Sequence, residues 1–172
     1  IDLVFQNWNN NEYNKVAEFG YPLVMKVIAD MDYSETVYLT PAEYKIAMMK
    51  DNSNAVLSRS AALCLRGYGN WDYEETIQVY STKQLEKPFE CDVVDSFDNI
   101  EYTIEHGILV CTERQAFIDL LKDPKNEIQT LLEALGDYYF THENSFDSLR
   151  LSAEQRSLLS KYENDAIHYW NY

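Results

Sequence analysis

Residues 107–124, GILVCTERQAFIDLLKDP, join a short apolar run to the start of an amphipathic helix. The ILV run predicts a buried strand. Thr112, followed by Gln115 three positions later, has the spacing of a helix N-cap and its capping-box partner. Apolar residues then recur at helical spacing until Pro124, and Asp119 is expected to be an exposed or ion-paired helix residue. We therefore predict a strand that leads directly into a helix with one buried face.

Helix start signals also occur on the N-terminal side of this stretch. Thr40, Pro41 and Glu43 have the order of an N-cap, a first-turn proline and a capping-box partner, which predicts a helix to about Lys50. Ser58 can cap a short helix, RSAALCLRG, whose final glycine suits a left-handed C-terminal cap. The two adjacent alanines in this second helix indicate close packing against another element.

Two more helices are expected after the opening stretch. Residues 126–140 carry an apolar stripe at helical spacing. Ser152 and Gln155 repeat the capping-box pattern and predict a C-terminal helix over residues 152–172. The polar segment between these helices, residues 141–150, is the best candidate for a hinge or a long loop.

Segments with strand character lie in the middle of the chain. Residues 76–80, TIQVY, alternate apolar and polar side chains, as a strand with one buried face does. Residues 88–111 contain two or three further strand candidates between polar turns. We therefore predict one α+β domain over residues 1–172, with a small central antiparallel or mixed sheet at about residues 75–111. Helices flank this sheet on both sides, with residues 1–50 as a helical N-terminal subregion.

Composition restricts the partners that the chain can bind. The 172 residues include 29 acidic and 14 basic side chains, which gives a formal net charge of −15 at pH 7. Nucleic-acid binding needs a basic face, and no cluster of lysines and arginines supplies one. An anionic membrane surface is disfavoured for the same reason, and no stretch approaches the roughly 18 apolar residues of a membrane helix. The acidic surface either keeps the protein soluble, which we favour, or meets a basic partner.

The cysteines and histidines are widely spaced. Cys64, Cys91 and Cys111 form no CxxC pair, which indicates buried, reduced thiols in a cytoplasmic protein. The three histidines have no metal-ligand spacing, so we expect no metal and no cofactor. A Cys/His dyad could assemble from Cys111 and His106. Because Cys111 ends an apolar strand, a structural thiol is the favoured interpretation.

Acidic residues are abundant enough to form pairs without a catalytic role. Asp92 and Asp95 are one such pair, and Asp72, Glu74 and Glu75 form a second group. These carboxylates would suit a hydrolase or a divalent metal only within an enclosing pocket. The chain has no phosphate-binding loop, dinucleotide-binding fingerprint, nucleophile elbow or zinc-protease motif. No residue is therefore predicted to be catalytic.

Aromatic residues are the other unusual feature, with 14 tyrosines, seven phenylalanines and three tryptophans. Without a basic face, stacking on nucleic-acid bases is a poor explanation for them. Core packing or anchoring at a protein interface fits better. Tyr162, Tyr169, Trp170 and Tyr172 are the best candidates for an exposed aromatic patch.

Two stretches together resemble a known family. The first is a small-residue helix before a turn and a strand, with the pattern residues Ser60, Ala61, Leu63 and Gly67. The second is the strand and capped helix of the opening stretch, with the pattern residues Thr112, Glu113, Arg114, Asp119, Leu120 and Leu121. Their order and spacing over about residues 45–140 resemble AbiEi-type antitoxins of type IV toxin–antitoxin and abortive-infection systems.

The resemblance implies a non-catalytic protein whose partner is a nucleotidyltransferase-like toxin. Members of the family usually begin with a DNA-binding winged helix, and residues 1–44 show no such pattern. Either that domain precedes Ile1, or this chain is a divergent member that does not bind DNA by itself. The arginines of the two matched helices, Arg59, Arg66 and Arg114, are candidates for a partner contact or for internal ion pairs, and we favour ion pairs.

Three functional hypotheses follow from these patterns. The leading one is a bacterial, cytoplasmic, antitoxin-like or regulatory protein that acts in phage defence through protein contacts. A second is a small enzyme whose site combines dispersed acidic residues with Cys111 or His106. A third is an acidic mimic of nucleic acid, which requires carboxylates aligned on one face at phosphate-like spacing.

Overall fold

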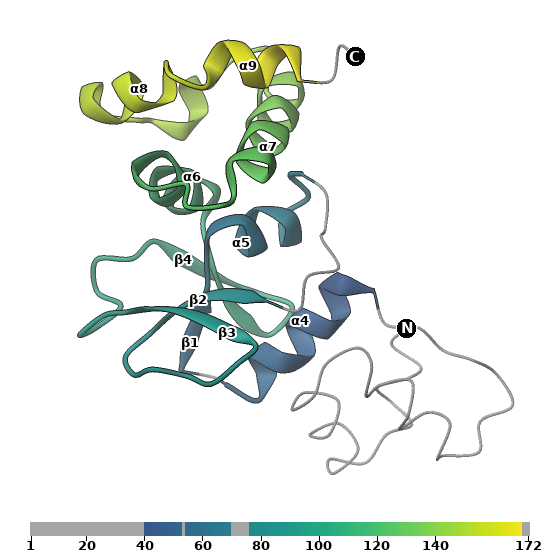
Figure 1. Cartoon of the computed structure of the whole chain (residues 1–172), viewed down its shortest axis with the longest axis vertical. Coiled ribbons are helices and arrows are strands. Elements are labelled where there is room, and N and C mark those ends of the chain that lie inside the picture. Colours follow the sequence, from purple (N-terminus) through teal and green to yellow (C-terminus); the bar gives the residue numbers. More distant parts are fainter. Residues whose placement is uncertain (1–39, 53, 70–75, 170–172) are drawn as a thin grey trace, which may run out of the picture.

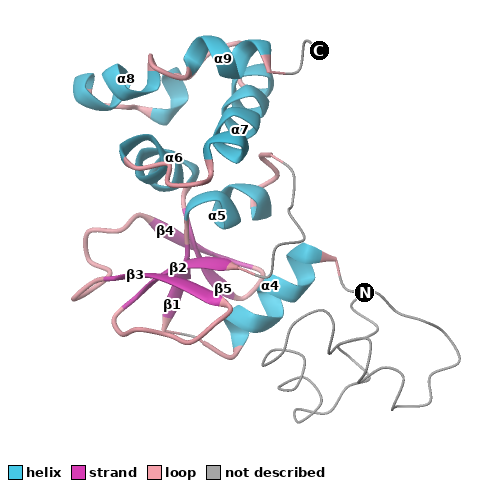
Figure 2. Ribbon diagram, in the orientation of Figure 1, coloured by secondary structure: helices cyan, strands magenta, loops and turns pink. Residues whose placement is uncertain are grey.

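The computed structural model describes residues 40–52, 54–69 and 76–169. These residues form a mixed five-stranded sheet and six α-helices (Figure 1). The sheet lies at one end of the described chain and the C-terminal helices at the other (Figure 2). This α+β architecture, in which the sheet is central in the sequence with helices before and after it, confirms the predicted fold class. The helices expected before Thr40 lie outside the described residues.

The sheet mixes both pairing directions, so of the two predicted sheet types the mixed one is present. Its strands are β1 Ala55–Leu57, β2 Ile77–Ser81, β3 Phe89–Val93, β4 Tyr102–Glu105 and β5 Ile108–Cys111. They lie in the order β3-β2-β1-β5-β4. β1 is antiparallel to β2 and parallel to β5, while β3 is parallel to β2 and β4 is antiparallel to β5. β3 and β4 are therefore the outer strands.

The sequence does not predict β1, the central strand, and places the start of the sheet about twenty residues too late. β1 has three residues, and each is at most 2% exposed. A strand this short and buried on both faces has no polar side, so it shows no alternation. Val56 pairs with Tyr80, while Leu57 pairs with both Val79 and Val110. β1 thus joins the two halves of the sheet.

The helices form layers that extend away from the sheet. They are α4 Pro41–Lys50, α5 Arg59–Leu65, α6 Glu113–Lys122, α7 Ile128–Thr141, α8 Ala153–Leu159 and α9 Glu163–His168. α4 and α5 contact the sheet, α6 packs against α5, and α7 to α9 lie at the far end (Figure 1). Across the described ranges, no helix combines the length and apolar character needed to cross a bilayer.

Helix caps explain where α4 and α8 begin. Thr40 and Glu43 form a complete capping box at the start of α4, with side-chain to backbone hydrogen bonds of 2.8 and 3.3 Å. Ser152 and Gln155 form the same box at α8, with distances of 2.9 and 3.2 Å. Each cap satisfies two backbone N–H groups that have no partner within the helix. At α5, Ser58 is the N-cap residue, but its side chain forms no capping hydrogen bond.

The capping box predicted for α6 is only half present. The Thr112 hydroxyl accepts the backbone N–H of Gln115 at 3.2 Å, as expected for an N-cap. The Gln115 side chain does not return to the cap, because its Oε1 accepts the backbone N–H of Glu101 at 3.1 Å. Gln115 therefore ties α6 to the segment that enters β4.

The C-terminal helix differs from its prediction. In place of one continuous helix, α8 and α9 are separated by a turn at residues 160–162. With this turn, both Leu159 and Ala166 are buried in the core, at 1% and 0% exposure. The preceding segment, residues 141–150, is mostly a loop, one of its two predicted forms, and it contains a short 3₁₀ helix and the buried side chain of Phe146.

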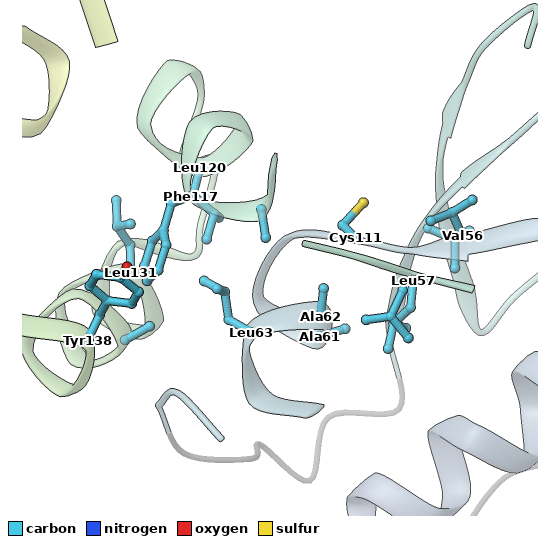
Figure 3. Packing of buried hydrophobic residues seen from close by; sticks show 14 of the residues in the cluster. Val56, Leu57, Ala61, Ala62, Leu63, Cys111, Phe117, Leu120, Leu131 and Tyr138 are labelled. Carbon is cyan, nitrogen blue, oxygen red and sulfur yellow. The ribbon is translucent and has the colours of Figure 1, made fainter. Parts of the chain in front are cut away.

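One hydrophobic core connects the sheet to the C-terminal helices through α5 (Figure 3). Ala61 and Ala62 are 2% and 0% exposed, and their small side chains let α5 approach its neighbours closely. Leu63, also fully buried, extends toward Phe117 of α6 and Tyr138 of α7 (Figure 3). Burying each large apolar side chain contributes about 1.5–3 kcal/mol to folding. The core therefore fixes the positions of α5, α6 and α7, which carry the polar residues described next.

Candidate functional site

A buried ion pair lies where the first turn of α5 meets the start of α7. Nε of Arg59 is 2.6 Å from Oε2 of Glu127, and the two side chains are 4% and 9% exposed. Nη2 of Arg59 also donates to the backbone carbonyl of Asp123 at 2.5 Å, and the Ser60 hydroxyl donates to Oε1 of Glu127. These contacts satisfy two charges that would each be costly to bury alone.

The backbone at Arg59 is strained. Its φ angle is 51°, in the left-handed region that residues other than glycine rarely adopt. Such a conformation costs on the order of 1–3 kcal/mol and persists only where surrounding contacts hold it. Here the contacts to Glu127 and Asp123 hold the guanidinium group in place. The ion pair therefore determines the local path of the chain from β1 into α5.

A second polar cluster surrounds Asp119 of α6. Nε2 of Gln115 donates to Oδ1 of Asp119 at 3.0 Å, and the Tyr80 hydroxyl of β2 interacts with the same carboxyl group. Burial raises the pKa of Asp119, although Tyr80, Gln115 and Arg59 act in the opposite direction. Burial and the nearby Asp119 carboxyl group also raise the pKa of Tyr80. Asp119 is therefore not the exposed or ion-paired residue that the sequence predicts.

The dyad considered for Cys111 and His106 is absent. Cys111 is the last of the four residues of β5, whereas His106 lies in the turn before the first, so the length of the strand, about 10 Å, separates them. His106 is exposed in the turn before β5, whereas Cys111 is 0% exposed. Burial raises the pKa of the Cys111 thiol, and the Asp119 carboxyl group raises it further. The thiolate form that a nucleophile requires is thus disfavoured. Cys64 is also buried, but Cys91 is only half-buried, contrary to its prediction.

The paired acidic residues do not assemble into one group. Asp92 is 3.4 Å from Nζ of Lys125, while Asp95 is exposed on the loop that follows β3. Residues 70–75, which include the other predicted acidic group, lie outside the described residues. Among residues 40–52, 54–69 and 76–169, no three His, Cys, Asp or Glu side chains are arranged to hold a metal ion.

Arg66, at the C-terminal end of α5, fastens the β4–β5 hairpin to the helical layer. Its guanidinium donates to the carbonyl groups of Cys111 and Val110 at 2.7 and 3.0 Å. It also donates to the Thr103 hydroxyl at 2.7 Å, and its Nη1 is 3.6 Å from Oε1 of Glu105. Arg66 thus neutralises part of the charge on one face of β4.

Arg114, in the first turn of α6, forms the third ion pair of this set. Its Nη1 is 2.5 Å from Oε1 of Glu101, and both side chains are partly exposed. Arg59, Arg66 and Arg114 therefore each form an ion pair within the chain. This is the favoured of the two roles inferred from the sequence, and a direct contact of these residues with a partner stays a prediction.

The aromatic patch expected at the C-terminus is not formed by the residues that the structure describes. Tyr162 is half-buried and packs against the core. The Tyr169 hydroxyl donates to Oε1 of Glu133 at 2.8 Å, which attaches α9 to α7. Trp170 and Tyr172 lie outside the described residues. Tyr162 and Tyr169 therefore form contacts within the helical part of the fold.

The large exposed apolar side chains lie mainly on the outer strands. Ile104 and Tyr102 of β4 are 71% and 39% exposed, and Val93 at the end of β3 is 54% exposed. Ile128 and Phe140 of α7 are 46% and 50% exposed. Isolated exposed apolar residues are ordinary, but two that alternate along one outer strand form a continuous surface. Of the two outer strands, β4 carries two exposed apolar side chains on one face, whereas β3 carries one at its end.

The same region is strongly acidic. From residue 88 to residue 113 the chain has no lysine or arginine and seven acidic residues, namely Glu90, Asp92, Asp95, Asp98, Glu101, Glu105 and Glu113. Both outer strands and the loop between them belong to this segment. Asp95 and Asp98 in the loop are exposed and form no ion pair with any described residue. β4 therefore follows a loop that carries uncompensated negative charge.

Glu127, the partner of Arg59, is not among the residues that the sequence patterns single out. Glu127 directly precedes the apolar stripe of α7, and Asp119 interrupts the apolar run of α6. The sequence therefore indicates that both acidic residues lie next to buried positions. Neither signal identifies the partner across the fold.

Comparisons with protein-family models, with curated proteins and with solved structures find no match for this chain.

Proposed function

We propose that this chain is a non-catalytic, antitoxin-like or regulatory protein of the bacterial cytoplasm that acts through protein contacts. The observation that carries the proposal is that the side chains most capable of catalysis or ligand binding are instead paired or buried inside the fold. Arg59 is paired with Glu127, and the buried Cys111 has a pKa raised by its surroundings. The exposed features are instead an acidic surface and the apolar outer strand β4. Such a surface suits recognition of a protein with a basic patch.

The partner that we propose is a nucleotidyltransferase-like toxin of an abortive-infection system. This part of the proposal rests on the resemblance of two sequence patterns to AbiEi-type antitoxins. The helices that contain these patterns, α5 and α6, pack directly against each other. Their shared apolar positions are core residues, since Ala61, Leu63, Leu120 and Leu121 are at most 2% exposed. The patterns therefore describe a packing unit, and the surface that would select the toxin lies outside them.

Co-expression tests this function. Cells whose growth is arrested by a nucleotidyltransferase-like toxin of an abortive-infection system should regain growth when they also express the wild-type chain, and the two proteins should co-purify. Leu120→Asp is a control for folding, because it places a charge at a fully buried position and should abolish protection. Unchanged toxicity in the presence of folded wild-type chain would overturn the proposal.

A further inference from the structure

We propose that the outer edge of β4 binds an extended, basic segment of a partner protein, which adds to the sheet beyond β4. The proposal rests on the function proposed above, because it assigns the surface through which the protein contacts would form. β4 is an outer strand, with β5 as its neighbour on one side. Strand addition to such an edge obtains affinity from main-chain hydrogen bonds and specificity from alternate side chains.

The hairpin that contains β4 determines which backbone groups are available. His106 and Gly107 have φ angles of 52° and 77°, which form a two-residue turn with both central residues left-handed. In such a hairpin the residues that flank the turn, Glu105 and Ile108, exchange hydrogen bonds. The alternation continues along the strand, because the N–H of Thr112 donates to the carbonyl of Glu101 at 3.0 Å.

This register directs alternate backbone groups of β4 away from the sheet. Glu101, Thr103 and Glu105 face β5, so the N–H and carbonyl groups of Tyr102 and Ile104 point toward the open edge. Natural proteins protect an outer strand with charged side chains, especially lysine, with proline or a bulge, or by keeping the strand short. β4 has four residues and the charged side chain of Glu105, but it contains neither lysine nor proline and pairs with β5 without a bulge. Its edge therefore opposes an acidic strand and stays open to a short basic one.

The side chains of β4 specify the composition of the added strand. Tyr102 and Ile104 share one face and are both exposed, which favours apolar residues at the matching positions of the partner. Glu101 and Glu105 lie on the other face, where their side chains are 47% and 45% exposed beside Arg114 and Arg66. Lysine or arginine opposite these carboxylates would form cross-strand ion pairs.

The charge of the surroundings selects a basic partner over a second copy of this chain. Asp98 is exposed four residues before β4 and forms no ion pair within the described region. Pairing between two β4 edges would bring like charges together, and each chain carries a formal net charge of −15. The occupant that fits is therefore a strand in which apolar residues alternate with lysine or arginine.

A synthetic peptide of alternating lysine and valine, with the sequence KVKVKVK, provides a direct test with the intact chain. At saturating peptide, amide hydrogen exchange at Tyr102 and Ile104 should slow by at least about tenfold, and binding should weaken as salt increases. The matched peptide EVEVEVE should have no effect. Unchanged exchange at these two amides, or the same protection by both peptides, would overturn the proposal.

Two proline variants separate edge binding from a general loss of structure. Ile104→Pro removes an N–H that points outward without removing a bond to β5, so the chain should fold while the affinity for KVKVKVK falls at least about tenfold. Val93→Pro is the matched control, because it replaces an exposed apolar residue at the end of the other outer strand, β3. The N–H of Val93 also points away from the sheet, since it is the N–H of Val94 that donates to Ser81 of β2. Equal affinities of the two variants would contradict the assignment to β4.

The same variants in the co-expression assay distinguish this inference from the proposed function. If wild-type and Val93→Pro chains protect cells but Ile104→Pro does not, both proposals are supported. If all three protect equally, the β4 edge is not the docking site, while the antitoxin function stands. If folded wild-type chain fails to protect but KVKVKVK still shields Tyr102 and Ile104, the antitoxin function fails and the binding edge stands.

Discussion

Removal of the Glu127 carboxylate should destabilise the protein more than any change to a surface charge. In Glu127→Ala, the Arg59 guanidinium stays 4% exposed and keeps only its hydrogen bond to the Asp123 carbonyl. The Ser60 hydroxyl loses its acceptor at the same time. An uncompensated buried charge of this kind costs about 3–5 kcal/mol. That is a large fraction of the roughly 5–15 kcal/mol by which a typical domain is stable.

The contrast between buried and exposed ion pairs provides the control. Glu101→Ala breaks the pair with Arg114, whose side chains are 34% and 47% exposed, and should cost only about 0.2–1 kcal/mol. A double variant, Arg59→Met with Glu127→Leu, removes both buried charges and should be more stable than Glu127→Ala alone. Urea unfolding followed by circular dichroism gives the free energies, provided that the slopes of the transitions agree.

Two outcomes would refute this reasoning. If Glu127→Ala costs no more than Glu101→Ala, Arg59 finds water or another partner, and the ion pair does not determine the local structure. If the double variant is less stable than Glu127→Ala, the interaction between the two charges stabilises the fold by more than the cost of burying them.

Three smaller effects should accompany these. Burial raises the folded pKa of Asp119 above 3.8, so the native state binds more protons than the unfolded state above that pH, and stability falls as pH rises through this window. Asp119→Asn should remove that fall and be more stable than wild type at neutral pH, as measured by urea unfolding across the pH range. In the native protein, iodoacetamide should modify half-buried Cys91 while Cys64 and Cys111 react only after unfolding, as judged by mass spectrometry. Gly67→Ala should lower the free energy of unfolding by about 1–2 kcal/mol in the same assay. The cause is the φ angle of 94° and not a clash, because nothing lies within 4 Å of the added Cβ. Gly67→Asn should lower it less, because asparagine tolerates left-handed backbone better than alanine.

Local signals in the sequence predicted most elements of the fold. The caps at Thr40 and Ser152 depend on residues three positions apart, so their geometry follows from the sequence alone. The partial box at Thr112 shows the limit of this approach. Gln115 had two acceptable partners, its own cap and the Glu101 backbone, and only the tertiary structure decides between them.

The candidate site was less predictable, because its contacts join distant parts of the chain. Arg59 was identified as a candidate for an ion pair, but its partner Glu127 belongs to another helix and is one of 29 acidic residues. Similarly, Asp119 occupies a position that helical spacing leaves at the margin of the apolar face. Its burial results from the approach of β2 and its Tyr80 hydroxyl, which no local pattern indicates.

The central position of β1 has a consequence for synthesis on the ribosome. Leu57 pairs with Val110, so the two halves of the sheet cannot join until β5 has been translated. At about 5–20 residues per second, this delay lasts roughly 3–10 seconds. During that interval the edge of the apolar strand β1 that later pairs with β5 stays unpaired. A chaperone that binds short aliphatic segments would find its target there, and release would coincide with the arrival of the β4–β5 hairpin.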